Sequence, residues 1–72
     1  MEEKVKEIMA GVFEVNVNEL PENINQENFE DWTSIKHLTL IVEIEEEFDK
    51  AFEPEEISEM TSLSKIIEYI SK

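Results

Sequence analysis

The first segment of the chain repeats apolar residues with the period of an α-helix. The residues at i, i+3, i+4 and i+7 are Val5, Ile8, Met9 and Val12, with Phe13 beside them. This spacing predicts an amphipathic helix from about residue 2 to residue 13, with one face turned to a core.

Residues 14–32 interrupt the helical pattern. Five asparagines and Pro21 lie within them, and a turn-rich connection of this length has to be anchored to the rest of the fold. We expect its apolar residues to be the anchors: Val15, Val17, Leu20, Ile24 and Phe29.

The strongest helical pattern begins near Ser34 and continues to Phe48. At about 100° per residue, one broad arc is apolar and contains Leu38, Leu40, Ile41, Ile44 and Phe48. Ser34 stands at the helix start, where backbone N–H groups lack partners and the helix dipole favours anions. A phosphate ester on Ser34 would be stabilised there, although a serine in this place also serves as an ordinary N-cap.

Two shorter patterns complete the chain. Pro54 suits the first position of a brief helix, with Glu55 and Glu56 in its first turn. Thr61 is the expected N-cap of a last helix, which carries the apolar residues Leu63, Ile66, Ile67 and Ile70. The sequence therefore predicts an all-α fold, a small four-helix bundle of three main helices and one short helix, in a single domain over residues 1–72.

Length and charge narrow the classes of function. A chain of 72 residues buries only about 60% of its unfolded surface, which favours binding or carrying over catalysis, so we expect no enzyme. The net charge of −13 opposes binding to nucleic acid or anionic membranes and favours partners with basic surfaces. No cysteine is present, so disulfides and thiolate metal sites are excluded.

The chain shows no signal for export or membrane insertion. Its first residues lack a basic segment followed by an apolar one, and no apolar stretch approaches the ~20 residues that span a bilayer. We expect a cytoplasmic protein that is a monomer.

The residues around Ser34 resemble a known motif. Trp32-Thr33-Ser34-Ile35-Lys36-His37-Leu38 is similar to the Trp-Asp-Ser-Leu-x-His-Leu variant found in discrete acyl and peptidyl carrier proteins. Ile44-Glu45-Glu46-Glu47-Phe48 resembles the acidic end of their second helix, and residues 54–63 and 66–70 fit their third and fourth helices. The resemblance covers essentially the whole chain and implies their fold, including its long first loop.

The resemblance implies that Ser34 carries 4′-phosphopantetheine, transferred from coenzyme A by a separate phosphopantetheinyl transferase. The thiol of that arm would hold an acyl or aminoacyl group as a thioester, and a freestanding carrier would deliver it to biosynthetic enzymes. The pathway stays open between fatty acid, polyketide, nonribosomal peptide and sugar decoration. Thr33 replaces the family's aspartate, which helps present magnesium and the donor to the transferase. This departure supports an alternative, an unmodified carrier-like acidic module for protein interaction.

Further site residues follow from the resemblance and from the helical pattern. The surface that partner enzymes read would include Thr33, Ile35, Lys36, Thr39, Val42, Glu45 and Glu46. An apolar pocket between the second helix and the short third one would shelter an acyl chain, lined by Ile44, Phe52, Ile57 and Met60.

His37, Trp32 and the asparagine-rich segment invite other interpretations. His37 follows Ser34 by three residues, as in a Ser-His hydrolase, but it shares the buried arc and no acid is placed to orient it. We expect His37 to pack under the long loop, and Trp32 to pack that loop against the bundle with its N–H satisfied. Residues 16–27 have the length of a calcium loop, with Asn16, Asn18 and Glu27 at ligand positions. They lack its glycine and have Leu20 at the fifth position, so we expect no metal site.

Overall fold

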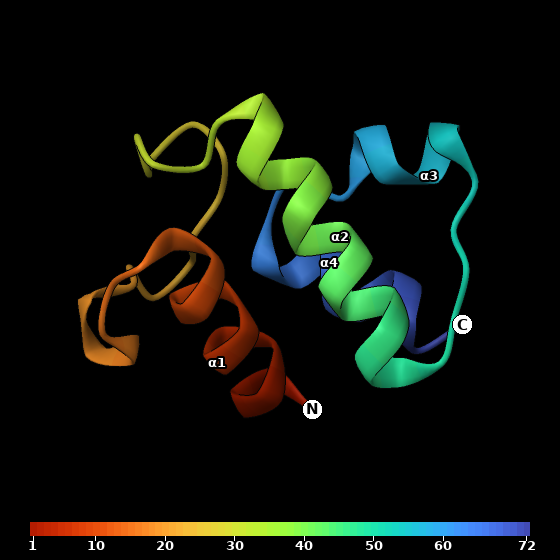
Figure 1. The fold of residues 1–72 in the computed structure, drawn as a ribbon, viewed down its shortest axis with the longest axis horizontal. Coiled ribbons are helices and arrows are strands. Elements are labelled where there is room, and N and C mark those ends of the chain that lie inside the picture. Colours follow the sequence, from red (N-terminus) through yellow and green to blue (C-terminus); the bar gives the residue numbers. More distant parts are fainter.

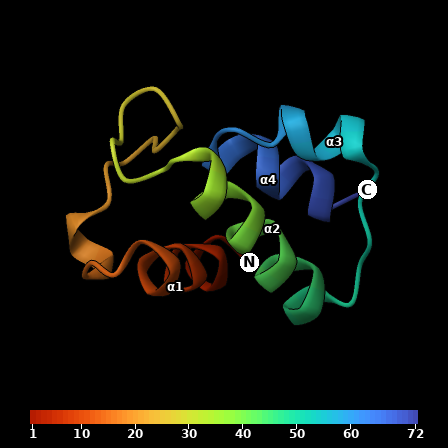
Figure 2. The ribbon, with the colours of Figure 1, turned by 45° about the horizontal axis from the view of Figure 1, so that its top comes forward.

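The computed structural model describes residues 1–72 and contains four α-helices and no strands. Three are long, α1 (Glu2–Phe13), α2 (Ser34–Phe48) and α4 (Leu63–Ile70), and one is short, α3 (Pro54–Glu59). The predicted all-α, four-helix fold is confirmed. The α2 helix crosses the middle of the molecule, with α4 behind it and α3 to one side in Figure 1, and α1 packs against both α2 and α4 (Figures 1 and 2).

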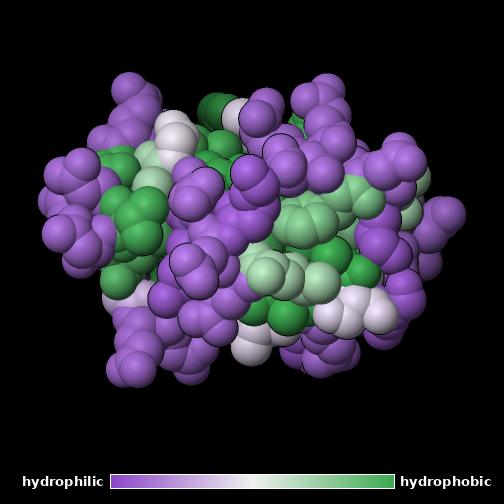
Figure 3. All heavy atoms as spheres, turned by 90° about the horizontal axis from the view of Figure 1, so that it is seen from below, coloured by the Kyte–Doolittle hydropathy of each residue, from purple (hydrophilic) through white to green (hydrophobic).

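One hydrophobic core joins the three long helices. Each contributes an apolar stripe, the long loop adds Ile24 and Trp32, and the end of α3 adds Met60. The core thus contains Val5, Met9, Phe13, Ile24, Trp32, Leu40, Ile41, Ile44, Met60, Leu63, Ile66, Tyr69 and Ile70. Polar residues cover much of the outside, and apolar atoms reach the surface between them in separate patches (Figure 3). No helix has both the length and the apolar character needed to cross a bilayer.

The long loop is anchored at its middle by an antiparallel bridge between Asn25 and Ser62. Gln26 N–H donates to Thr61 O, and Leu63 N–H donates to Ile24 O, each at 2.9 Å. These bonds hold the loop against the junction of α3 and α4. Four of the predicted anchors are buried or pack on the core: Val15, Leu20, Ile24 and Phe29.

Val17 was predicted as a fifth anchor, and this is wrong, since it is 45% exposed. It opens a 3₁₀ turn, η1 (Val17–Glu19), whose capping box pairs Asn16 with Glu19. The turn satisfies its own backbone and leaves the valine facing solvent.

Two further predictions need correction. Leu38 was placed in the core arc of α2, but it is 60% exposed and lines the groove between α2 and α3. His37, Leu40, Ile41 and Ile44 are the buried residues of α2. Thr61 was expected to cap α4. The cap is Ser62, whose hydroxyl accepts from Lys65 N–H, because the bridge to the long loop holds Ser62 extended before the first turn.

Tyr69, a core residue of α4, gives a test of the packing between α3 and α4. Tyr69 Oη donates a hydrogen bond to the Glu59 carboxylate, which raises the pKa of Tyr69 from 10.0 to about 12, with burial and nearby carboxylates adding to the shift. The unfolded chain therefore loses the phenol proton first, and the stability that this pair contributes falls as the pH rises from about 10 to about 12.

We expect the urea midpoint to fall across this interval more steeply in the native chain than in Tyr69→Phe. Tyr69 is the only tyrosine, so phenolate absorbance follows its titration directly. Glu59→Gln should move that titration to lower pH. An unchanged titration in Glu59→Gln would show that the pair does not form.

Candidate functional site

Ser34 is exposed and is the first residue of α2. The N-cap is its neighbour Thr33, whose Oγ1 accepts from Lys36 N–H at 3.3 Å, while His37 N–H donates to Thr33 O at 2.8 Å. The structure thus decides against the simple interpretation of Ser34 as a helix cap. Its hydroxyl is available for chemistry at the positive end of a helix of 15 residues.

Trp32 ties the chain just before Ser34 to the core. Its side chain is only 2% exposed, and its ring lies 5.5 Å, centroid to centroid, from that of Phe13 on α1. The indole Nε1–H donates to His37 Nδ1 at 2.9 Å. The expected role of Trp32, an apolar anchor with a satisfied N–H, is confirmed.

His37 is buried, as predicted, and is 7% exposed. Its ring contacts Trp32 at the end of the long loop and points from α2 toward α3. Its Nε2 is 2.8 Å from Ile57 O in α3, so both ring nitrogens are engaged. No carboxylate forms an ion pair with the ring. A tryptophan N–H and a backbone carbonyl therefore orient the ring, in place of the carboxylate that orients the histidine of a Ser-His hydrolase.

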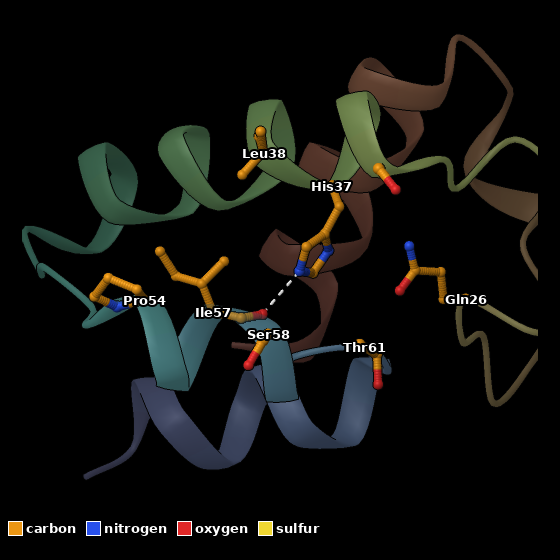
Figure 4. Close-up of a pocket in the computed structure, with 8 residues that line it drawn as sticks. Gln26, His37, Leu38, Pro54, Ile57, Ser58 and Thr61 are labelled. Atoms are coloured by element: carbon orange, nitrogen blue, oxygen red, sulfur yellow. Dashed lines mark hydrogen bonds between the residues drawn. The ribbon is translucent and has the colours of Figure 1, made fainter.

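A groove of about 590 Å³ begins at Ser34 and lies between α2 and α3. His37 and Leu38 line it from α2, and Ile57 points toward them from α3 (Figure 4). The full lining is Gln26, Ser34, His37, Leu38, Pro54, Ile57, Ser58 and Thr61. The groove thus places apolar side chains, an amide and hydroxyl groups next to the serine.

The sequence matches the family described as "Phosphopantetheine attachment site" over residues 3–70. The chain belongs to this family. No curated protein matches the sequence. In this family 4′-phosphopantetheine is attached covalently, so the chain is a carrier domain.

The site of the carrier domain fits such a group on two observations. The N–H groups of Ser34 and Ile35 precede the first intrahelical hydrogen bond of α2 and are free to face a phosphate. The groove that starts at Ser34 offers hydrogen-bonding and apolar surface along its length. No three acidic, histidine or cysteine side chains converge to hold a metal ion in the carrier domain.

The residues predicted to line an acyl pocket are divided. Only Ile57 lines the groove. Ile44 and Met60 are fully buried in the core, and Phe52 is half-buried, with its N–H donating to Glu45 Oε2 at 2.8 Å. The shelter of an acyl chain by these four residues stays a prediction.

The residues predicted to contact partners lie in two kinds of surroundings. Ile35 and Val42 are 78% and 50% exposed, and with the exposed Leu38 they form an apolar stripe along α2, starting beside Ser34. Thr39 and Glu46 are also exposed. The other three make contacts within the carrier domain instead. Thr33 is the N-cap of α2, Lys36 donates a hydrogen bond to Val12 O in α1, and Glu45 accepts one from Phe52 N–H.

Sequence reasoning missed the tie made by Lys36. Its Nζ donates to Val12 O at 2.9 Å and pairs with Glu14 Oε2 at 3.3 Å. Val12 and Glu14 lie at the C-terminal end of α1, where carbonyl groups lack partners and a cation is favoured. The available signal was that α1 has no basic residue in its last turn and ends at Glu14 rather than at a glycine.

We expect Lys36→Met to lower the free energy of unfolding by about 1 kcal/mol, because Val12 O loses a charged donor at a partly exposed position. Urea denaturation measures the change. Glu14→Gln removes only the ion pair and should cost less. Equal losses in both variants would contradict the bond to Val12 O.

We expect Thr33→Ala to lower the free energy of unfolding by about 1 kcal/mol through loss of the N-cap of α2. Thr33→Asp should leave it unchanged or raise it, since aspartate caps at least as well and suits the helix dipole. The same denaturation experiment applies. A stable Thr33→Ala would show that another group caps α2.

Proposed function

We propose that this chain is a carrier protein whose Ser34 receives 4′-phosphopantetheine from coenzyme A through a separate transferase. The observation that carries the proposal is that the N-cap of α2 and its exposed serine are two different residues. Thr33 caps the helix, so Ser34 is left exposed at its first position within a chain that matches the attachment-site family.

The residues of the chain would hold and present the arm rather than catalyse a reaction. The arm itself supplies a thiol, which the chain lacks, and this thiol holds an acyl or aminoacyl group as a thioester. The helix N-terminus at Ser34 stabilises the phosphate, and the groove beside it offers Gln26, Ser58 and Thr61 as polar neighbours. We propose no catalytic residue in the chain.

The proposed docking surface is the apolar stripe of Ile35, Leu38 and Val42 with the acidic residues around it. These three side chains are exposed on α2 next to Ser34. The chain carries a net charge of −13, so we propose cytoplasmic partner enzymes with basic docking surfaces. Such contacts would be weak and sensitive to salt.

The proposal is tested by intact-mass spectrometry after incubation with coenzyme A, magnesium and a broad-specificity phosphopantetheinyl transferase. We expect a gain of one phosphopantetheinyl group in the native chain and none in Ser34→Ala. Ser58→Ala is the matched control, because Ser58 is also exposed and lines the same groove. A gain that persists in Ser34→Ala would place the attachment elsewhere.

The alternative is an unmodified acidic module for protein interaction, and Thr33 is the observation that favours it. Thr33 provides the cap without the carboxylate that the family uses during modification. Running Thr33→Asp in the same assay distinguishes the two functions. If Thr33→Asp is modified but the native chain is modified neither by this transferase nor by one from its own host, the result would support the interaction module and contradict the carrier function.

A further inference from the structure

The short helix α3 is attached to the rest of the chain by the apolar side chains of Ile57 and Met60, which pack on the core, and by a few identifiable hydrogen bonds. A helix of six residues is not stable by itself and depends on such contacts. Glu59 at its end accepts from Tyr69 of α4, and Phe52, ahead of its start, donates to Glu45. These two contacts fix the flanks of α3 but do not cross the groove beside Ser34.

His37 makes the hydrogen bond that crosses the groove. Its Nε2 reaches from α2 to Ile57 O, 2.8 Å away, as Figure 4 shows. The same carbonyl accepts Met60 N–H at 3.2 Å, so the bond meets α3 at its last turn. The distance between the two walls of the groove is therefore linked to the position of one imidazole ring.

Trp32 determines which ring nitrogen holds the proton. An indole N–H can only donate, so Nδ1 of His37, 2.9 Å away, has to accept. The proton of the neutral ring is then on Nε2, which donates to Ile57 O. The groove lining contains no other titratable side chain that could compete for this proton.

We propose that His37 is a positioning residue that holds α3 against α2 and sets the width of the groove beside Ser34, and thereby the size of the cargo that the groove accepts. Trp32 acts through it by locking the ring as the Nε2–H tautomer. The core beneath the groove is closed, since Ile44 and Met60 are fully buried, so a larger cargo requires α3 to move. The part of the proposal that concerns cargo depends on the proposed carrier function.

The first test uses the unmodified chain and does not depend on carrier function. The ¹⁵N spectrum of the imidazole should show the Nε2–H tautomer in the native chain. Hydrogen exchange at the Ile57 and Met60 amides should rise severalfold in His37→Asn and His37→Phe. Asparagine can still accept a hydrogen bond from Trp32 but is too short to donate to Ile57 O. Phenylalanine keeps the shape of the ring and makes neither hydrogen bond.

His37→Gln is the matched rescue, because its amide nitrogen takes the place of Nε2 and should return exchange in α3 toward the native rate. Exchange at Met9 in α1 should stay unchanged in all variants. An Nδ1–H tautomer, unchanged exchange in α3, or an equal rise in α1 and α3 would overturn the proposal. The last result would mean that His37 supports the whole core rather than α3.

The second test measures cargo size. Carrier chains loaded from acetyl- or dodecanoyl-coenzyme A are treated with hydroxylamine, which cleaves the thioester. The ratio of the dodecanoyl to the acetyl cleavage rate is lower when the longer acyl chain is better shielded. We expect this ratio to fall severalfold in His37→Asn, where α3 can move away, and to recover in His37→Gln. An unchanged ratio would overturn the role in cargo size. Failure of the carrier function would appear separately, as the absence of any mass gain in the native chain. That result would overturn the cargo role of His37. The tautomer and hydrogen-exchange measurements would still decide whether His37 positions α3.

Discussion

The buried chain of hydrogen bonds from Trp32 through His37 to Ile57 O is the contact on which the site depends. It joins the end of the long loop, the core face of α2 and the last turn of α3. Every member has its partner, and no buried side-chain nitrogen or oxygen in the structure lacks one. Loss of one member would leave another buried and unpaired, which costs more than the bond itself contributes. Ser34 owes its position to this network, because it lies between Trp32 and His37 in sequence.

The basic side chains are held away from the groove beside Ser34. Several lysines are engaged within the chain: Lys4, Lys6 and Lys36 in ion pairs, Lys50 with the backbone of Lys72, and Lys72 over the ring of Tyr69. None lines the groove that starts at Ser34. The flank of α2 beside the groove carries the exposed apolar side chains of Ile35, Leu38 and Val42, within a chain of net charge −13. A partner that binds there gains from matching both features.

Periodicity predicted the helices well because burial of one stripe determines where each helix forms. α1 begins and ends at the predicted residues, and Pro54 opens α3. The errors concern residues whose surroundings come from distant segments. Leu38 shares the apolar arc in sequence, but the short α3 does not cover it. The contacts of Lys36 lie 22 and 24 residues away, and those of Ser62 depend on Asn25, so a local pattern contains no record of them.

Thr33 shows how a single residue can serve the fold while changing the chemistry beside it. An aspartate in its place would also cap α2, so the cap alone does not explain a threonine. The difference is charge, since threonine accepts the Lys36 N–H without placing a carboxylate next to Ser34. A phosphate on Ser34 would then meet the free N–H groups at the start of α2 without repulsion from position 33. If Ser34 carries the phosphate, as proposed, the stability of the ester and the recruitment of magnesium by the transferase are separate demands on this position, and threonine would meet only the first.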